Sequence, residues 1–206
     1  MNFLAHLHLS GNNDHIKIGN FIADAVKGKT YQKFHTEIQK GILLHRKIDE
    51  FTDLHPITKE INTYFTGKYR KYSGIVTDIM YDYYLANDWE LYSDIDYKDF
   101  VADTYDLLML NFRILPLRIK KILPFFIGKN RLMSYRDIEG IRSVLSAMAK
   151  YTSLPSGADF TIDIMQKNND FFRNRFQLFY QELMLFSEKE LSNLNKGNRI
   201  IVRKSA

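Results

Sequence analysis

The chain has 206 residues and no cysteine, and its 29 basic and 24 acidic side chains give a net charge of +5. The lack of cysteine excludes disulfide scaffolds, thiolate zinc sites, iron–sulfur clusters and cysteine nucleophiles. With 45% hydrophobic residues, 13 Tyr and 15 Phe, the composition excludes disorder as the main state of the chain.

Apolar residues recur at helical spacing along the whole chain, and the alternation that is typical of strands is absent. The first helix is expected between Asp14, its N-cap, and Gly28, and a long helix is expected to end before Pro56. Further helices are expected around residues 75–84 and 100–108, between Pro116 and Pro124, and around 138–148 and 160–194, the last as one or two helices. The sequence therefore predicts an all-α fold, with a single domain over residues 1–196 and a basic C-terminal tail over 197–206.

The apolar stretches do not predict a membrane segment. The opening MNFLAHLHLS lacks a basic start and contains two histidines, so it is a poor signal peptide. The other apolar runs break within a few residues, far short of the roughly 20 that a span needs. We therefore expect a cytoplasmic protein with no membrane span.

Charge is distributed unevenly along the chain. Residues 76–106 contain nine acidic residues and a single lysine, whereas residues 113–142 contain eight basic residues and two acidic ones. All six histidines lie at or before position 55. This pattern predicts metal ligands in the N-terminal half and an anionic partner at the C-terminal half. The alternative is a chance drift of charge among solvated helix faces.

Two pairs of residues repeat the spacing that places side chains on one helix face. His45 and Asp49 are four residues apart, with Asp53 a further four along, and Asp78 and Asp82 repeat the spacing. Residues four apart on a helix have Cβ atoms about 5–6 Å apart, close enough to bind one ion. Apolar residues flank both pairs, and a buried carboxylate is costly unless it is paired or metal-bound.

Three further residues belong to the same hypothesis. Asp24 interrupts an apolar stretch, and His6 and His8 lie in the opening segment, where helical geometry lets at most one of the two face a shared site. Imidazole and carboxylate ligands without sulfur indicate Mn²⁺ or Mg²⁺, with Zn²⁺ or Fe²⁺ as alternatives. Taken singly, each residue also has a purely structural interpretation, as a core histidine or a paired or solvated carboxylate. We interpret the remaining histidines, His15, His35 and His55, as structural or exposed.

Other catalytic patterns are absent from the sequence. It contains neither an HExxH motif nor a Glu-x-x-His pair, which argues against zincins and ferritin-like di-iron bundles. It also lacks a glycine-rich phosphate loop and a G-x-S-x-G elbow.

Four sequence strings resemble one known family. MNFLAHLHLS, GNFIADAVKG, GILLHRKIDEFTDLHP and DIMYDYYLANDW occur in this order and cover most of residues 1–89. They resemble bacterial acyl carrier protein phosphodiesterases, divergent relatives of the metal-dependent HD phosphohydrolases. The resemblance implies an HD-like helical bundle, a divalent metal, most commonly Mn²⁺, and hydrolysis of the phosphodiester between 4′-phosphopantetheine and a serine of holo-acyl carrier protein.

The resemblance also implies a set of site residues. The metal-site motifs of the family fall on six positions, with Asp53 and His8 as further candidates: His6, Asp24, His45, Asp49, Asp78 and Asp82. Five of the six, all except Asp82, are the expected catalytic residues. The literal His-Asp dipeptide of HD proteins does not occur in the sequence, and separated residues take its place.

The expected mechanism follows from the charge of the substrate. A divalent ion neutralises a phosphoryl oxygen and activates water for attack in line with the departing serine oxygen. Asp53, His6 or His8 would orient the water or protonate the leaving oxygen, and Lys27, Arg46 or Lys47 would stabilise charge on the phosphoryl group.

The basic segment is the expected contact with the acidic carrier protein. Its candidate partner-binding residues are Arg113, Arg118, Lys120, Lys121, Lys129, Arg131 and Arg136. The first alternative function is an HD-type phosphohydrolase of a nucleotide or another small phosphoester. The second is a non-enzymatic basic helical module, although the sequence shows no motif for reading nucleic acid, and no nucleic-acid partner is expected.

Overall fold

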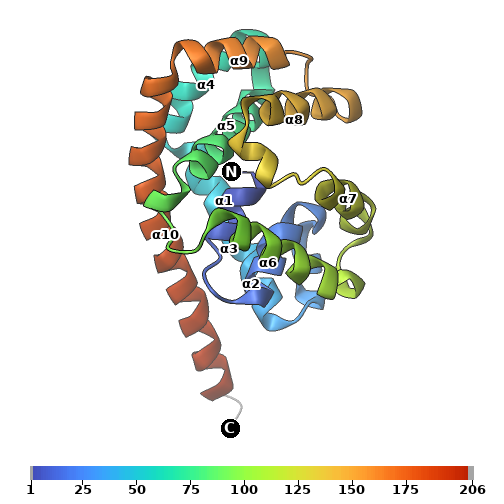
Figure 1. Ribbon diagram of the computed structural model, residues 1–206. Helices are drawn as coiled ribbons and strands as arrows, with labels where there is room; N and C mark the ends of the chain where they lie inside the picture. The colour runs from blue at the N-terminus through green and yellow to red at the C-terminus, as the bar shows by residue number, and fades with distance from the viewer. Residues whose placement is uncertain (1, 204–206) are drawn as a thin grey trace.

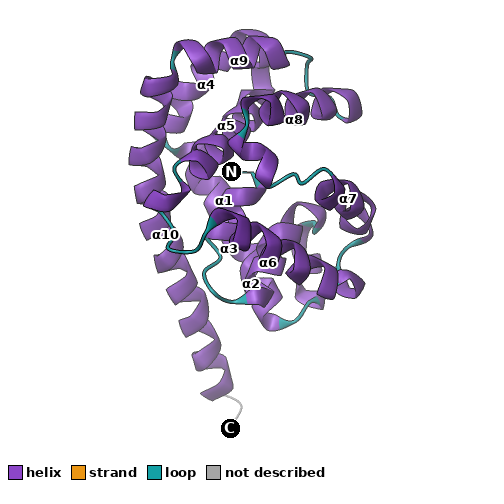
Figure 2. Cartoon of the chain, in the orientation of Figure 1, coloured by secondary structure: helices purple, strands orange, loops and turns teal. Residues whose placement is uncertain are grey.

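The structure, a computed structural model, describes the backbone of residues 2–203 and the side chains of residues 2–196. Every regular element in this range is a helix (Figure 2), which confirms the predicted all-α class. The α-helices in this range are α1 (Phe3–His8), α2 (Asp14–Ile22), α3 (Thr36–Leu54), α4 (Pro56–Tyr69), α5 (Ser73–Asn87), α6 (Tyr97–Leu110), α7 (Leu117–Gly128), α8 (Ile138–Tyr151), α9 (Ala158–Lys167) and α10 (Asn169–Arg203).

The first helix boundaries differ slightly from those predicted. The side chain of Asn13, not Asp14, caps α2, because its oxygen accepts a backbone N–H of the first turn. The α-helix ends well before Gly28, and two short 3₁₀ helices follow, η1 (Ala23–Ala25) and η2 (Gly28–Lys33). The long helix α3 ends before Pro56, as predicted.

The basic helix α7 is longer than predicted. It does not stop at Pro124 but continues to its last residue, Gly128. Proline removes one helical hydrogen bond, yet the buried side chains of Leu123 and Phe126 hold the helix on the core on both sides of it. The predicted stretch 160–194 divides into α9 and α10. The backbone of α10 continues to Arg203, and the side chains of the predicted basic tail, 197–206, lie outside the described residues.

The short helix α1 lies in the middle of the molecule, and α10 runs along one side of it (Figure 1). Four consecutive residues of α1 are buried, so the helix is enclosed by its neighbours. Buried aromatic side chains of α10 fill the core: Phe172, Phe176, Phe179 and Tyr180. Phe176 and Phe179 contact Tyr81 of α5, and Phe176 also contacts Tyr84. Among the described residues, no helix combines the length and the apolar character that crossing a bilayer requires.

Candidate metal centre

The crossing of α2 and α3 is unusually close because a glycine lies on each side of it. A Cβ atom at Gly19 would lie 2.1 Å from a backbone oxygen of α3, and one at Gly41 would lie 2.2 Å from a backbone oxygen of α2. Residues with a side chain do not fit there, whereas glycine permits this backbone approach. The crossing brings Asn20, the neighbour of Gly19, against His45, one helical turn beyond Gly41.

Asn20 fixes the orientation of the His45 ring. Nδ1–H of His45 donates to the amide oxygen of buried Asn20 at 3.0 Å, while the Asn20 amide nitrogen donates to the backbone oxygen of His6 at 2.8 Å. The other ring nitrogen, Nε2, therefore faces two carboxylates. It lies 3.4 Å from Oδ1 of Asp24 and 3.1 Å from Oδ2 of Asp49.

Asp82 anchors α1, the helix that carries His6. The two carboxylate oxygens of this fully buried residue accept the backbone N–H groups of Leu4 at 2.8 Å and Ala5 at 3.2 Å. These N–H groups belong to the first turn of α1 and lack partners within the helix. Because both oxygens are engaged in this way, we assign Asp82 to the positioning of α1.

His6 completes a cluster with His45, Asp49 and Asp24. The His6 and His45 rings stack with centroids 3.8 Å apart, and His6 Nε2 lies 3.1 Å from Asp49 Oδ1. One ligand atom from each of His6, His45 and Asp49 falls within 4.8 Å of the others. The histidine side chains are 3% and 8% exposed, whereas those of Asp49 and Asp24 are 39% and 72% exposed. The imidazole rings of the cluster are thus buried, and its carboxylates lie nearer the surface.

The pKa values show how strongly these groups interact. Burial disfavours the charged His45 ring, but hydrogen bonds to Asp24 and Asp49 outweigh burial and raise its pKa to about 9. Burial and the charge of neighbouring His45 lower the pKa of His6 to about 4. Burial acts to raise the pKa of Asp49, but hydrogen bonds to the two histidines overcome it and lower that pKa, and the bond with His45 lowers the pKa of Asp24. The two carboxylates are therefore strong anions that attract a cation.

The second predicted pair, Asp78 and Asp82, lies on α5, and Asp78 interacts electrostatically with Asp49 of the cluster. Burial raises the pKa of half-buried Asp78, and the negative charges of Asp49 and Asp53 raise it further. Asp53 itself is exposed, one turn beyond Asp49 on α3. The structure thus brings four of the six predicted ligands into contact: His6, Asp24, His45 and Asp49.

His8 points away from the cluster. Its Nδ1 accepts the hydroxyl hydrogen of Tyr180 at 2.7 Å and its Nε2–H donates to the backbone oxygen of Tyr92 at 3.1 Å. Burial lowers its pKa, and both of its ring nitrogens bond to residues outside the cluster. His55 caps α4, while His15 and His35 are exposed, in line with the structural or exposed interpretation of these three.

Of the three cations suggested for charge stabilisation, two have other partners. Arg46 donates to the backbone oxygens of Val26 and Gly28, which ties η2 to α3. Lys47 pairs with Glu50 at 3.3 Å. Lys27, three residues after Asp24, is exposed.

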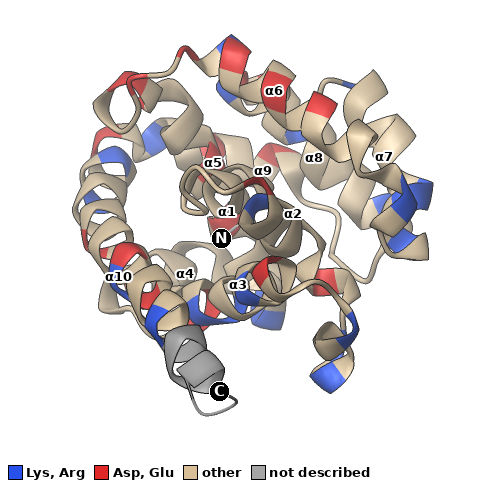
Figure 3. Ribbon diagram, turned by 90° about the horizontal axis from the view of Figure 1, so that it is seen from below, with Lys and Arg blue, Asp and Glu red and all other residues tan. Residues whose placement is uncertain are grey.

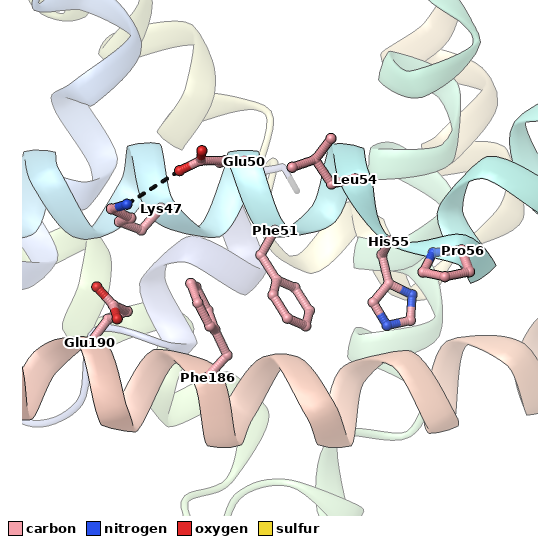
Figure 4. Close-up of a pocket in the computed structure, with 8 residues that line it drawn as sticks. All are labelled: Lys47, Glu50, Phe51, Leu54, His55, Pro56, Phe186 and Glu190. Atoms are coloured by element: carbon pink, nitrogen blue, oxygen red, sulfur yellow. Dashed lines mark hydrogen bonds and ion pairs between the residues drawn. The ribbon is translucent and has the colours of Figure 1, made fainter.

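A groove of about 380 Å³ lies between α3 and α10 (Figure 4). Phe51 and Phe186 stack inside it with centroids 4.5 Å apart, and the Lys47–Glu50 pair lies on its rim. Helical geometry places these α3 residues on the face opposite His45 and Asp49. The groove is therefore separate from the cluster.

The predicted partner-binding residues divide into two groups. Lys120 donates to the backbone oxygen of Arg113, and Arg136 pairs with Glu90 at 2.7 Å. Arg131 is half-buried. The side chains that remain exposed are Arg113, Arg118, Lys121 and Lys129. Four of the seven predicted residues thus have exposed side chains.

The fold and the cluster together define an all-helical protein with a candidate centre of two imidazoles and two carboxylates. A sequence profile of the family described as acyl carrier protein phosphodiesterase matches residues 1–183. The chain is 30% identical over 185 residues to the acyl carrier protein phosphodiesterase of Yersinia pestis, covering 89% of this chain and 96% of the relative. It is 32% identical over 186 residues to that of Escherichia coli O139:H28, with coverage of 89% and 96%.

A third relative, from Yersinia enterocolitica, carries the same name and is 33% identical over 150 residues, covering 72% of this chain and 78% of its own. The chain therefore belongs to the acyl carrier protein phosphodiesterase family, a family of enzymes. No solved structure matches it, so the predicted kinship with HD phosphohydrolases stays a prediction.

Proposed function

We propose that this protein is a metal-dependent phosphodiesterase that cleaves 4′-phosphopantetheine from holo-acyl carrier protein, leaving the apo-protein. The observation that carries the proposal is the convergence of His6, Asp24, His45 and Asp49 in a chain of this family. The substrate follows from the name of the relatives. The cytoplasmic location expected from the sequence is part of the same proposal.

The donor atoms of the cluster fit a divalent ion. Asn20 holds one hydrogen of His45 on Nδ1, so Nε2 is the ring atom that faces the carboxylates of Asp24 and Asp49. Without a metal these carboxylates hold a proton on Nε2 and raise the pKa of His45 to about 9, and a divalent ion bound there would take the place of that proton. Mixed imidazole and carboxylate ligands suit Mn²⁺, with Mg²⁺ or another divalent ion as alternatives. Asp78, whose pKa is raised by burial and by the charge of Asp49, is a further candidate ligand.

When bound, the ion would supply positive charge to the phosphoryl group and lower the pKa of water. The side chains divide the remaining tasks. The buried rings of His6 and His45 would form the inner part of the site, and Asp49 would contact both rings. The exposed carboxylate of Asp24 would accept a hydrogen bond from water at the surface. The exposed ammonium group of Lys27, three residues after Asp24, would be one source of positive charge for the phosphoryl oxygens.

The test combines metal analysis with mass spectrometry. Purified protein is analysed for bound metal, then incubated with holo-acyl carrier protein and Mn²⁺, and the carrier is weighed for loss of the phosphopantetheine arm. We expect the wild-type protein to release the arm. His45→Ala and Asp49→Asn should bind Mn²⁺ at least about tenfold more weakly and lose turnover, since even outer partners of ligands contribute 10–100-fold.

His15→Ala is the control, because it removes an exposed histidine outside the cluster. Near-normal metal affinity and turnover in His45→Ala would remove that residue from the centre. Release of phosphate from small phosphoesters but not from the carrier would favour the alternative phosphohydrolase. Absence of both metal and turnover would favour a binding module.

A further inference from the structure

The outward face of α7 carries a row of alternating apolar and basic side chains. It consists of Leu117, Arg118, Lys121 and Phe125, all exposed, and is called the α7 face below. Residues four apart lie on one line of a helix, so Lys121 lies between Leu117 and Phe125. Large apolar side chains that gather on an exposed face mark an interaction surface.

The surroundings of the α7 face strengthen its positive charge. No acidic residue occurs in the sequence between Asp106 and Asp137, and Figure 3 shows blue Lys and Arg residues on α7 without red ones. In the part of the chain with described side chains, Arg118 and Lys121 pair with no carboxylate. Their charges are therefore available to a partner.

The opposite, buried face of α7 rests on the segments that build the metal centre. Phe126 contacts Phe3 with ring centroids 5.0 Å apart and Phe21 with centroids 5.5 Å apart. Phe3 begins α1, which carries His6, and Phe21 precedes Asp24 by three residues. α7 thus packs directly on the segments that carry two members of the cluster.

We propose that the α7 face is the docking surface for the acidic acyl carrier protein, an inference that rests on the proposed function. The scissile phosphodiester is attached directly to a serine of the carrier, so the body of the carrier must reach the centre, and not only the end of its arm. A docking helix that packs on the segments carrying His6 and Asp24 would bring the carrier close to the centre. Carboxylates of the carrier would pair with Arg118 and Lys121, and apolar side chains of the carrier would contact Leu117 and Phe125.

The order of side chains on α7 favours an acidic protein over an anionic membrane. A helix that lies in a membrane surface points an apolar stripe toward the lipid and carries its basic residues on the polar face. On α7, by contrast, Lys121 occupies the centre of the outward line between two apolar side chains. A partner surface with carboxylates among apolar residues complements this pattern.

The test compares two matched double variants. Leu117→Ala with Lys121→Glu changes the α7 face. Leu185→Ala with Lys189→Glu changes the same residue types at the same spacing on α10, and the two leucines are 68% and 69% exposed. Each protein is measured for binding of apo-acyl carrier protein, for hydrolysis of holo-acyl carrier protein, and for hydrolysis of bis-p-nitrophenyl phosphate with Mn²⁺.

We expect the α7 variant to raise the Kd for the apo-carrier and the KM for the holo-carrier by about tenfold or more, because charge reversal turns attraction into repulsion. The α10 control should match the wild type, and both should hydrolyse the small diester at wild-type rates. Equal carrier binding by the two variants would overturn the docking surface. The docking surface would also be overturned if the α7 variant lost the binding to phosphatidylglycerol vesicles that the wild type shows but kept its binding to the carrier.

The binding measurement separates this inference from the proposed function. Wild-type protein that binds the apo-carrier through the α7 face, yet releases no phosphopantetheine, would refute the hydrolysis and leave the docking surface intact. Release with the same KM in the wild type and the α7 variant would refute the docking surface alone.

Discussion

The amide of Asn20 holds two residues of the cluster in place. Its oxygen accepts a hydrogen bond from His45, and its nitrogen donates to the backbone of His6 and to the hydroxyl of Ser10. The side chain is fully buried, so a lost hydrogen bond is not replaced by bulk water. Asn20 is therefore a positioning residue for the centre.

Asn20→Ala should weaken Mn²⁺ binding by about 10–100-fold, the usual effect of removing the partner that orients a metal-ligating histidine. Higher Mn²⁺ concentration should restore most of the turnover, because the ligands themselves remain. Calorimetric titration with Mn²⁺ measures the affinity, and turnover of a small diester at low and saturating Mn²⁺ measures the recovery.

Thr161→Ala is the matched control. It breaks a buried hydrogen bond, 2.8 Å long, between Thr161 of α9 and Tyr69 of α4. Both variants should lose about 1–3 kcal/mol of stability, but the control should bind Mn²⁺ as the wild type does. An Asn20→Ala protein with wild-type Mn²⁺ affinity would contradict the positioning role.

Sequence spacing predicted part of the centre and could not predict the rest. The four-residue spacing correctly placed His45 and Asp49 on one face. The same spacing made Asp78 and Asp82 look equivalent to this pair. The contact between Asp82 and α1 joins residues 77 and 78 positions apart in the chain, so local spacing could not reveal it. Asn20 was missed, although an amide within the apolar stretch GNFIADAV was a signal of a buried polar contact.

Helix α1 is anchored by the side chain of Asp82. It has six residues, too few to be stable alone, and its first-turn N–H groups are bound by Asp82. Burial raises the pKa of Asp82 to about 7 even though these hydrogen bonds act to lower it. The anchor of the helix that carries His6 thus changes its charge near neutral pH.

This pKa predicts a pH dependence of stability. Between pH 4 and pH 7, the unfolded chain loses the Asp82 proton while the folded protein keeps it, so this residue makes the free energy of unfolding fall as pH rises. Asp82→Asn lacks this effect, and its stability relative to the wild type should therefore increase from pH 5 to pH 7. Urea unfolding of metal-free protein at both pH values gives the difference.

The amide side chain of the Asp82→Asn variant accepts one N–H instead of two, so a constant offset in stability is expected at every pH. Only the change of the difference with pH reports the titration. Parallel pH profiles of wild type and variant would show that Asp82 is ionised throughout this range.

The presence of the helices was easier to predict than the residues at which they end. Apolar periodicity reported the buried faces of the long helices correctly, because each packs one face on the same core. The predicted end of α7 was wrong because Pro124 was interpreted as a helix end from the local sequence alone. Burial of Leu123 and Phe126 keeps the helix packed on the core beyond this proline. The α2–α3 crossing has no local signal at all, since glycine can serve many purposes.

Across the whole molecule, charge separates into two regions. The stretch 76–106, on α5 and α6, is strongly acidic, whereas the stretch that contains α7 is basic. An acidic partner is repelled by one region and attracted by the other, which orients it during encounter. This effect acts on association rather than on bond cleavage.

The separation predicts a salt dependence that differs between substrates. Raising the ionic strength from about 0.1 M to about 1 M shortens the Debye length from about 10 Å to about 3 Å. The kcat/KM for holo-acyl carrier protein should fall several-fold, with kcat unchanged, while kcat/KM for bis-p-nitrophenyl phosphate should change little. Steady-state kinetics at constant Mn²⁺ concentration measure both, and an equal decline for both substrates would place the salt effect at the metal centre instead.

The glycine crossing also limits which mutations the protein tolerates. Any side chain at Gly19 or Gly41 would push α2 from α3 and separate Asn20 from His45. These two positions have no functional group, yet the chemistry of the centre restricts them as tightly as it restricts a ligand. In a scan of all single substitutions scored by activity, they would be indistinguishable from the residues that perform the reaction, although neither lies within its reach.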